Sequence, residues 1–307
     1  MKQILWFACC GVGLVAAEPP AAMRLARQAY EDARAGRVEE AAAGLREATR
    51  LAPGNALYRS ALGGLLEKRG RLEEAVAEFG EAARLDSKFR TRFESVSLDF
   101  GAQLAHAGRF RSGLPFAKAT AQRFPESARA AIMLGLFLTR NQQNLAAVEA
   151  YRRAVTLAPE LPEANVGLGI AQSNAGLTAE AAATFEDGLR RFPRDAMHRQ
   201  AFGVLLVKLA ETGQAGAAAQ AARMLESALA LDATLAEAHY QLGALSLANG
   251  DASAAQARFS RAAALGLDDA RLHYAWARAL RRLNRGSEAD EHLAIFQAQK
   301  AASEAAR

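Results

Sequence analysis

The feature that most constrains this chain is a group of four positions that recurs about every 34 residues. In residues 145–160, LAAVEAYRRAVTLAPE, these positions hold Ala147, Tyr151, Ala154 and Pro159. Other copies hold Ala181, Phe185, Gly188 and Pro193; Gly113, Ala117, Thr120 and Pro125; and Ala75, Phe79, Ala82 and Ser87. The i, i+4, i+7 spacing predicts a helix with one buried face, and proline ends it.

A second helix precedes each of these, because an apolar residue followed by a very small one recurs in phase. The pairs are Leu62-Gly63, Phe100-Gly101, Leu134-Gly135, Leu168-Gly169, Phe202-Gly203, Leu242-Gly243 and Trp276-Ala277. A turn is predicted between the two helices of each repeat, at Gly36, Gly70, Gly108, Gln142, Gly176, Gly213 to Gly216, Gly250 and Asn284. The sequence therefore predicts eight helix-turn-helix units.

These slots resemble those of the tetratricopeptide repeat family, which has a small residue midway along the first helix and Ala, a ring, Ala and Pro in the second. The resemblance implies an all-α, right-handed α-solenoid. Isolated helix pairs of this size cannot bury their apolar stripe, so they stack, and only Gly or Ala fits where two axes come close. The predicted repeats span residues 22–55, 56–89, 94–127, 128–161, 162–195, 196–235, 236–269 and 270–303, within one continuous domain over 18–307.

Irregular positions predict local geometry. Two insertions, RTRF at 90–93 and ETGQAG at 211–216, are expected in loops. Pro115 falls inside a second helix, where it removes a hydrogen bond, so a late start or a bend is expected. In the last repeat Phe296 replaces the small residue that would admit another helix, so no ninth repeat is expected to dock.

Residues 1–17 have the layout of a secretory signal peptide, with Lys2, an apolar run from Ile4 to Val15 and small residues before Glu18. The run is short for a membrane span, which needs about 18 apolar residues, although a retained anchor is the alternative. Lipidation is disfavoured because Cys9 comes too early. Both cysteines, Cys9 and Cys10, would leave with the segment, which suits an oxidising compartment. We therefore expect an exported, periplasmic protein without stable membrane insertion after cleavage.

The sequence predicts no enzyme, cofactor or metal site. The five histidines lie in different predicted helices, and His239 and His273 occupy equivalent packing positions in stacked helices. A metal pair would need closer approach and further ligands. Outside the leader the sequence has no phosphate-binding loop, nucleophile elbow, CxxC or HExxH motif. The net charge of +5 is modest, and basic and aromatic residues do not alternate along one face, so nucleic acid is not the expected partner.

The first helices are expected to line a concave groove with an apolar middle and a cationic C-terminal end, and with Arg140 as an isolated charge midway. The predicted partner-binding residues are Leu98, Ile132, Leu136, Val166, Ile170, Val204, Tyr240, Tyr274, Arg271, Arg278, Arg281 and Arg282. An exposed apolar strip of this size suggests a protein partner, whose extended or helical segment is apolar with an acidic end. The competing interpretation is that the strip belongs to the core.

The sequence therefore predicts a non-catalytic scaffold or adaptor of the bacterial cell envelope, by analogy with exported proteins of this type. Two alternatives stay open. A small-molecule or catalytic module would need convergent polar groups in the groove. A helical-repeat RNA binder would need a cytoplasmic protein with polar base readers in each repeat.

Overall fold

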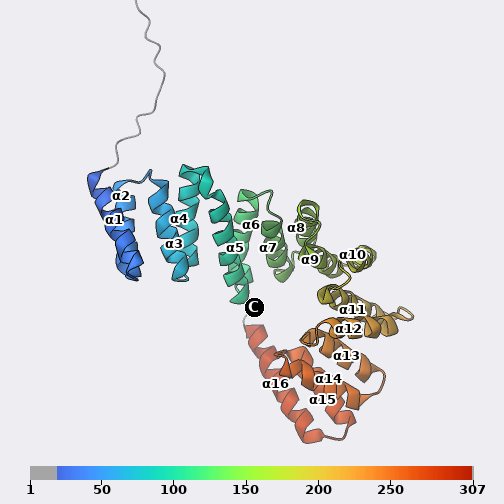
Figure 1. The fold of residues 1–307 in the computed structure, drawn as a ribbon. Helices are drawn as coiled ribbons and strands as arrows, with labels where there is room; N and C mark the ends of the chain where they lie inside the picture. Colours follow the sequence, from blue (N-terminus) through green and yellow to red (C-terminus); the bar gives the residue numbers. More distant parts are fainter. Residues whose placement is uncertain (1–18, 306–307) are drawn as a thin grey trace, which may run out of the picture. The chain divides into compact units, whose positions relative to one another are not determined.

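The computed structural model of the protein describes residues 19–305, and there it consists of helices and turns (Figure 1). The predicted signal peptide lies outside the described residues. The described chain forms two compact units, which divide between Gly108 and Arg109. The sequence predicted one continuous array and gave no sign of a division inside the third helix pair.

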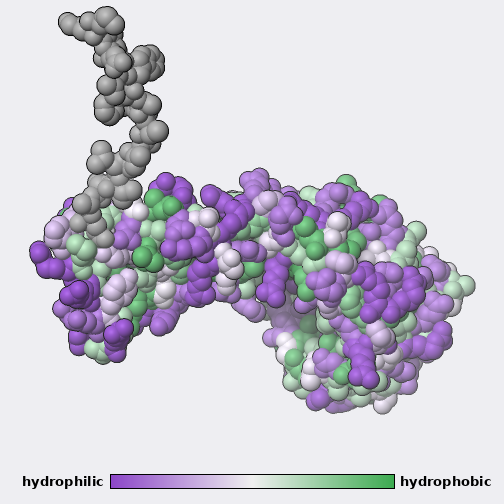
Figure 2. Space-filling view, turned by 45° about the horizontal axis from the view of Figure 1, so that its top comes forward, coloured by the Kyte–Doolittle hydropathy of each residue, from purple (hydrophilic) through white to green (hydrophobic). Residues whose placement is uncertain are grey.

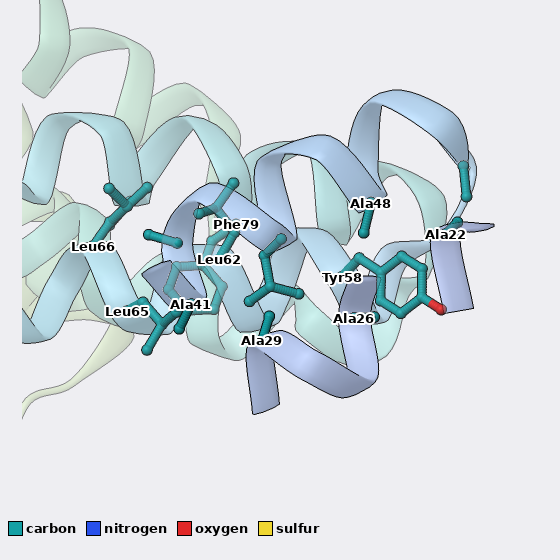
Figure 3. Close-up of a cluster of buried hydrophobic side chains, with 14 of the residues drawn as sticks. Ala22, Ala26, Ala29, Ala41, Ala48, Tyr58, Leu62, Leu65, Leu66 and Phe79 are labelled. Atoms are coloured by element: carbon teal, nitrogen blue, oxygen red, sulfur yellow. The ribbon is translucent and has the colours of Figure 1, made fainter. Parts of the chain in front are cut away.

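The first unit contains two complete helix pairs and the first helix of the third. Its elements are α1 (Pro20–Arg34), α2 (Val38–Leu51), α3 (Ala56–Lys68), α4 (Leu72–Leu85), a short 3-10 helix (Ser87–Phe89) and α5 (Arg90–His106). Buried alanines of α1 and α2 share one core with Tyr58, Leu62 and Phe79 (Figure 3). Small side chains therefore let the first helices pack closely around a few large ones.

The second unit contains the remaining helices. They are α6 (Phe110–Arg123), α7 (Ala128–Arg140), α8 (Asn144–Leu157), α9 (Pro162–Asn174), α10 (Thr178–Arg191), α11 (Ala196–Glu211), α12 (Ala217–Leu231), α13 (Ala236–Ala248), α14 (Ala252–Ala264), α15 (Ala270–Arg282) and α16 (Gly286–Ala305). Several first helices begin after a side chain that caps the first turn, as Ser127 does for Ala130 N–H and Asp195 for His198 N–H. The predicted all-helical fold is confirmed over the described residues, which contain sixteen α-helices in repeats.

The predicted turns are confirmed by backbone geometry. Each one contains a residue in the left-handed region, which is glycine in most repeats. The two exceptions that the repeat phase picked out, Gln142 and Asn284, have φ values of 60° and 59°. The phase of the repeat therefore located turns even where the residue type gave a weak signal.

In five repeats the small residue of the first helix lies directly against the large residue of the second helix. A Cβ atom added to Gly169 would lie 2.5 Å from the Phe185 ring, and one added to Gly243 would lie 2.6 Å from the Phe259 ring. Tyr151 is held from two sides, since Gly135 of α7 and Gly167 of α9 both contact its ring. Burial raises the pKa of Tyr151 to about 12. These contacts confirm that the slots are close-approach positions.

One local expectation was wrong, and of the two alternatives given for Pro115 the late start is excluded. Residues 90–93 do not form a loop but the first turn of α5, so the insertion lengthens that helix at its N-terminal end. The α6 helix does not start late, because it begins at Phe110 and contains Pro115 in its interior. The second insertion does form a loop after Glu211, the last residue of α11. Extra residues in phase with a helix are thus absorbed by extending it.

Candidate partner-binding surface

The first helices of the second unit form a continuous layer, because α7 contacts α9, α9 contacts α11, α11 contacts α13, and α13 contacts α15. We call the side chains that lie three residues before and one residue after the small slot of these helices the first-helix face. They are Ile132, Leu136, Val166, Ile170, Gln200, Val204, Tyr240, Ala244, Tyr274 and Arg278. Leu98 lies in α5 of the other unit, where it is half-buried.

The apolar residues of the first-helix face differ in exposure. Ile170 is 36% exposed and Tyr274 is 46% exposed, whereas Val166 is 7% exposed and belongs to a core cluster with Phe185 and Phe202. Ile132, Leu136, Val204 and Tyr240 are half-buried. In the space-filling view, apolar residues likewise reach the surface as separate patches among hydrophilic ones (Figure 2). A partner would therefore find individual apolar side chains rather than an unbroken strip.

The four arginines at the C-terminal end have different surroundings. Arg271 pairs with Asp269 at 2.7 Å and Glu237 at 3.2 Å and lies over the Tyr240 ring. Arg281 pairs with Asp290 at 3.4 Å. Arg282 donates to the Leu247 carbonyl, and Arg278 lies 5.9 Å from the centroid of the Tyr274 ring.

Arg271 and Arg281 thus have carboxylates of their own, and within the described residues Arg278 and Arg282 have no ion pair. Of the four arginines that the sequence placed at the cationic end, only two are therefore without a carboxylate partner in the described part of the chain. Arg278, which is exposed and belongs to the first-helix face, is the group best placed to receive an anion.

Sequence reasoning missed two further residues of the same surface. Met197 is 44% exposed on α11, and Lys208, one turn after Val204, contacts Ser173 Oγ and Asn174 Oδ1 of α9, each at 3.3 Å. Extending the helical spacing from Val204 by four residues would have found Lys208, and going back seven would have found Met197. Both add to the first-helix face.

Four of the five histidines contact a neighbouring helix, and the fifth, His106, is exposed near the end of α5. His239 does not meet His273, since its Nδ1 faces Arg258 of α14 at 3.4 Å. His273 Nδ1 instead lies 2.8 Å from His292 Nδ1 of α16, and its Nε2 lies 2.8 Å from Asp268. Over the described residues no group of three potential ligands is placed to hold a metal ion.

His198 is fully buried and explains an irregular slot. Its Nε2 lies 3.1 Å from Asn165 Oδ1, its ring stacks on Phe192, and burial lowers its pKa. A Cβ atom at position 188 would lie 2.2 Å from the His198 ring. This contact is why α10 has Gly188 where five other second helices have alanine.

Comparisons with known proteins agree with this architecture. The tetratricopeptide repeat family model matches residues 26–88 and 99–162. No curated protein matches the chain in sequence. None of the described helices is both long enough and apolar enough to cross a membrane.

Solved structures with this fold are numerous. A tetratricopeptide repeat protein from Parabacteroides merdae is 18% identical, with a TM-score of 0.56 over 85% of this chain and all of its own. TTC0263 from Thermus thermophilus is 25% identical, with a TM-score of 0.51 over 56% of this chain and 91% of its own. PilW, a widely conserved type IV pilus biogenesis factor, is 17% identical, with a TM-score of 0.54 over 67% of this chain and 92% of its own.

Proposed function

We propose that the first-helix face binds an apolar segment of a partner protein in the bacterial cell envelope. The chain is a tetratricopeptide repeat protein, and proteins of this fold generally act as scaffolds for protein partners. The observation that carries the proposal is the exposure of Ile170 and Tyr274, together with neighbouring Met197. Single exposed apolar side chains are ordinary, but these three lie on α9, α11 and α15 of one helical layer.

The charges around these side chains favour an acidic group in the partner. Arg278 and Lys208 lie on the same layer, and neither has a carboxylate partner in the part of the chain that the structure describes. A carboxylate of the partner would supply the missing counter-charge at the rim of the apolar contact. Rim charges of this kind govern orientation and association rate more than affinity.

Placement in the envelope is supported by the sequence of residues 1–17, which has the three regions of an exported leader. Export would bring the first-helix face into contact with periplasmic partners. It also fits a chain whose only cysteines, Cys9 and Cys10, lie inside that leader.

Site-specific photocrosslinking in the cell of origin tests the binding surface. A photoreactive amino acid at Ile170 or Tyr274 should crosslink to a protein that is not captured from Glu186, an exposed position on the second helix α10. Adding Arg278→Gln to the Ile170 variant should weaken that crosslink, and more so at low salt. The same crosslinked product from all three positions would refute the assignment of the partner to the first-helix face.

A further inference from the structure

A pocket of about 500 Å³ lies in the second unit, away from the first-helix face, between α6 and α8 and over α7. Its interior is formed by Ala121, Phe124, Ala131, Leu138 and Ala150, all of them buried. Pockets that hold small molecules typically measure about 300–1,000 Å³ and are mainly apolar. This α6–α8 pocket therefore has the size and lining of a ligand site.

The pocket exists because α8 lacks side chains that other second helices have. At the position of Ala150, four other second helices carry a larger residue that is hydrogen-bonded to the first helix of the same repeat. These bonded pairs are Glu78 with Arg59 at 3.2 Å, Thr184 with Gln172 at 2.8 Å, Arg258 with His239 at 3.4 Å, and His292 with His273 at 2.8 Å.

In α8 the corresponding space is bordered by Ala131 and Leu138 instead. One turn earlier α8 has Ala146, where α4 and α10 have Glu74 and Glu180. Among the eight second helices, α8 alone has alanine at both positions.

The mouth of the pocket is cationic. Lys118 is exposed there and has no ion pair within the described residues. Arg153 donates to the Pro125 carbonyl, a neutral acceptor that leaves its charge uncompensated. Glu149 also lies at the mouth, where it shares Arg152 with Glu180, each pair at 2.8 Å. Two uncompensated cations therefore border an apolar interior.

We propose that the α6–α8 pocket binds a small amphiphilic anion, with an apolar chain or ring system in the interior and a carboxylate or sulfonate facing Lys118 and Arg153. Burial of apolar surface supplies most of the affinity and does not depend on direction. The two cations at the mouth select the sign of the polar end, because a cationic amphiphile would meet like charges. The site is independent of the partner surface proposed above.

Titration calorimetry with decanoate tests the site, with decanol and decyltrimethylammonium as ligands of the same chain length. Decanoate should saturate at one molecule per chain and bind several-fold more tightly than decyltrimethylammonium. Ala150→Met, which introduces the residue that α12 has at this position, Met224, should weaken decanoate binding more than tenfold. The control is Ala257→Met at an exposed site of α14, which should leave binding unchanged.

A charge variant separates the two parts of the site. Lys118→Gln combined with Arg153→Gln should weaken decanoate about two- to fivefold, as solvated ion pairs do, and leave decanol unaffected. If Ala150→Met does not fold, as judged by circular dichroism, Ala146→Glu replaces it, since α4 and α10 tolerate glutamate there. Absence of decanoate binding to the parent protein, or equal binding to the pocket variants, would overturn the proposal.

Discussion

Gly167→Ala should destabilise the second unit, although alanine is the better helix former. A Cβ atom on Gly167 would lie 2.2 Å from Cε1 of Tyr151, and one on Gly135, on the other helix, would lie 2.7 Å from Cε2. The Tyr151 ring therefore has backbone close to both of its edges, and it cannot move away from α9 without moving into α7. Either the ring or the α8–α9 contact must shift.

The expected cost is about 1–3 kcal/mol, the usual range for overpacking a filled core. It exceeds the gain of roughly 0.5–1 kcal/mol that alanine brings to a helix interior. Thermal unfolding followed at 222 nm measures the difference, at about 2–4 °C per kcal/mol for a unit of this size. Gly64→Ala is the matched control, because an added Cβ at Gly64 in α3 meets nothing within 4 Å. It should leave the midpoint unchanged or raise it.

A double-mutant cycle tests whether the Tyr151 ring causes this loss of stability. Tyr151→Leu introduces the residue that α12 has in this slot, Leu225, and removes the ring that the new Cβ would strike. In this background Gly167→Ala should cost less, with a coupling of roughly 0.5–3 kcal/mol between the two changes. Equal effects of Gly167→Ala in both backgrounds, or equal midpoints for the variant and its parent, would show that the ring does not set the slot.

Three further predictions follow from the same contacts and from the leader. Phe185→Ala should lower stability by about 3–5 kcal/mol, measured by urea unfolding, because its fully buried ring leaves a cavity. Burial lowers the pKa of His198, so the unfolded chain binds the extra proton, and stability should fall as pH drops below about 6.5; His198→Gln should flatten the pH dependence of the melting midpoint. Mass spectrometry of the exported protein should find Glu18 as its first residue, and a full-length product would contradict the leader assignment.

The fold could be predicted because each repeat has the same types of packing residue at the same spacing. A small residue at Gly169 and a ring at Phe185 are two halves of one contact, and the pair recurs across the chain. The turns also recur at fixed positions, and Gln142 accordingly adopts the left-handed conformation that glycine takes in the neighbouring repeats. Repetition thus allowed weak local signals to be read together.

Two features of the third repeat, residues 90–93 and Pro115, could not be predicted from the spacing of the repeats. An insertion preserves the phase of the following repeats whether it forms a loop or lengthens a helix, so spacing alone could not place residues 90–93. Pro115 likewise costs one hydrogen bond, and the remaining bonds and contacts of α6 keep the helix in place around it. Both outcomes depend on tertiary packing rather than on the residue itself.

The two surfaces differ in how much the sequence could reveal. Exposure within the first-helix face could not be predicted, since Val166 and Ile170 lie one turn apart and only the packing of neighbouring helices buries one of them. The charge of Arg281 is compensated by Asp290 from the next helix, which residue spacing did not show. The α6–α8 pocket is different, because it is bordered by two alanines where every other second helix has a larger residue at one position or at both. Aligning the repeats of the chain with one another shows where a large side chain is missing. Ala146 and Ala150 could therefore have been identified from the sequence alone.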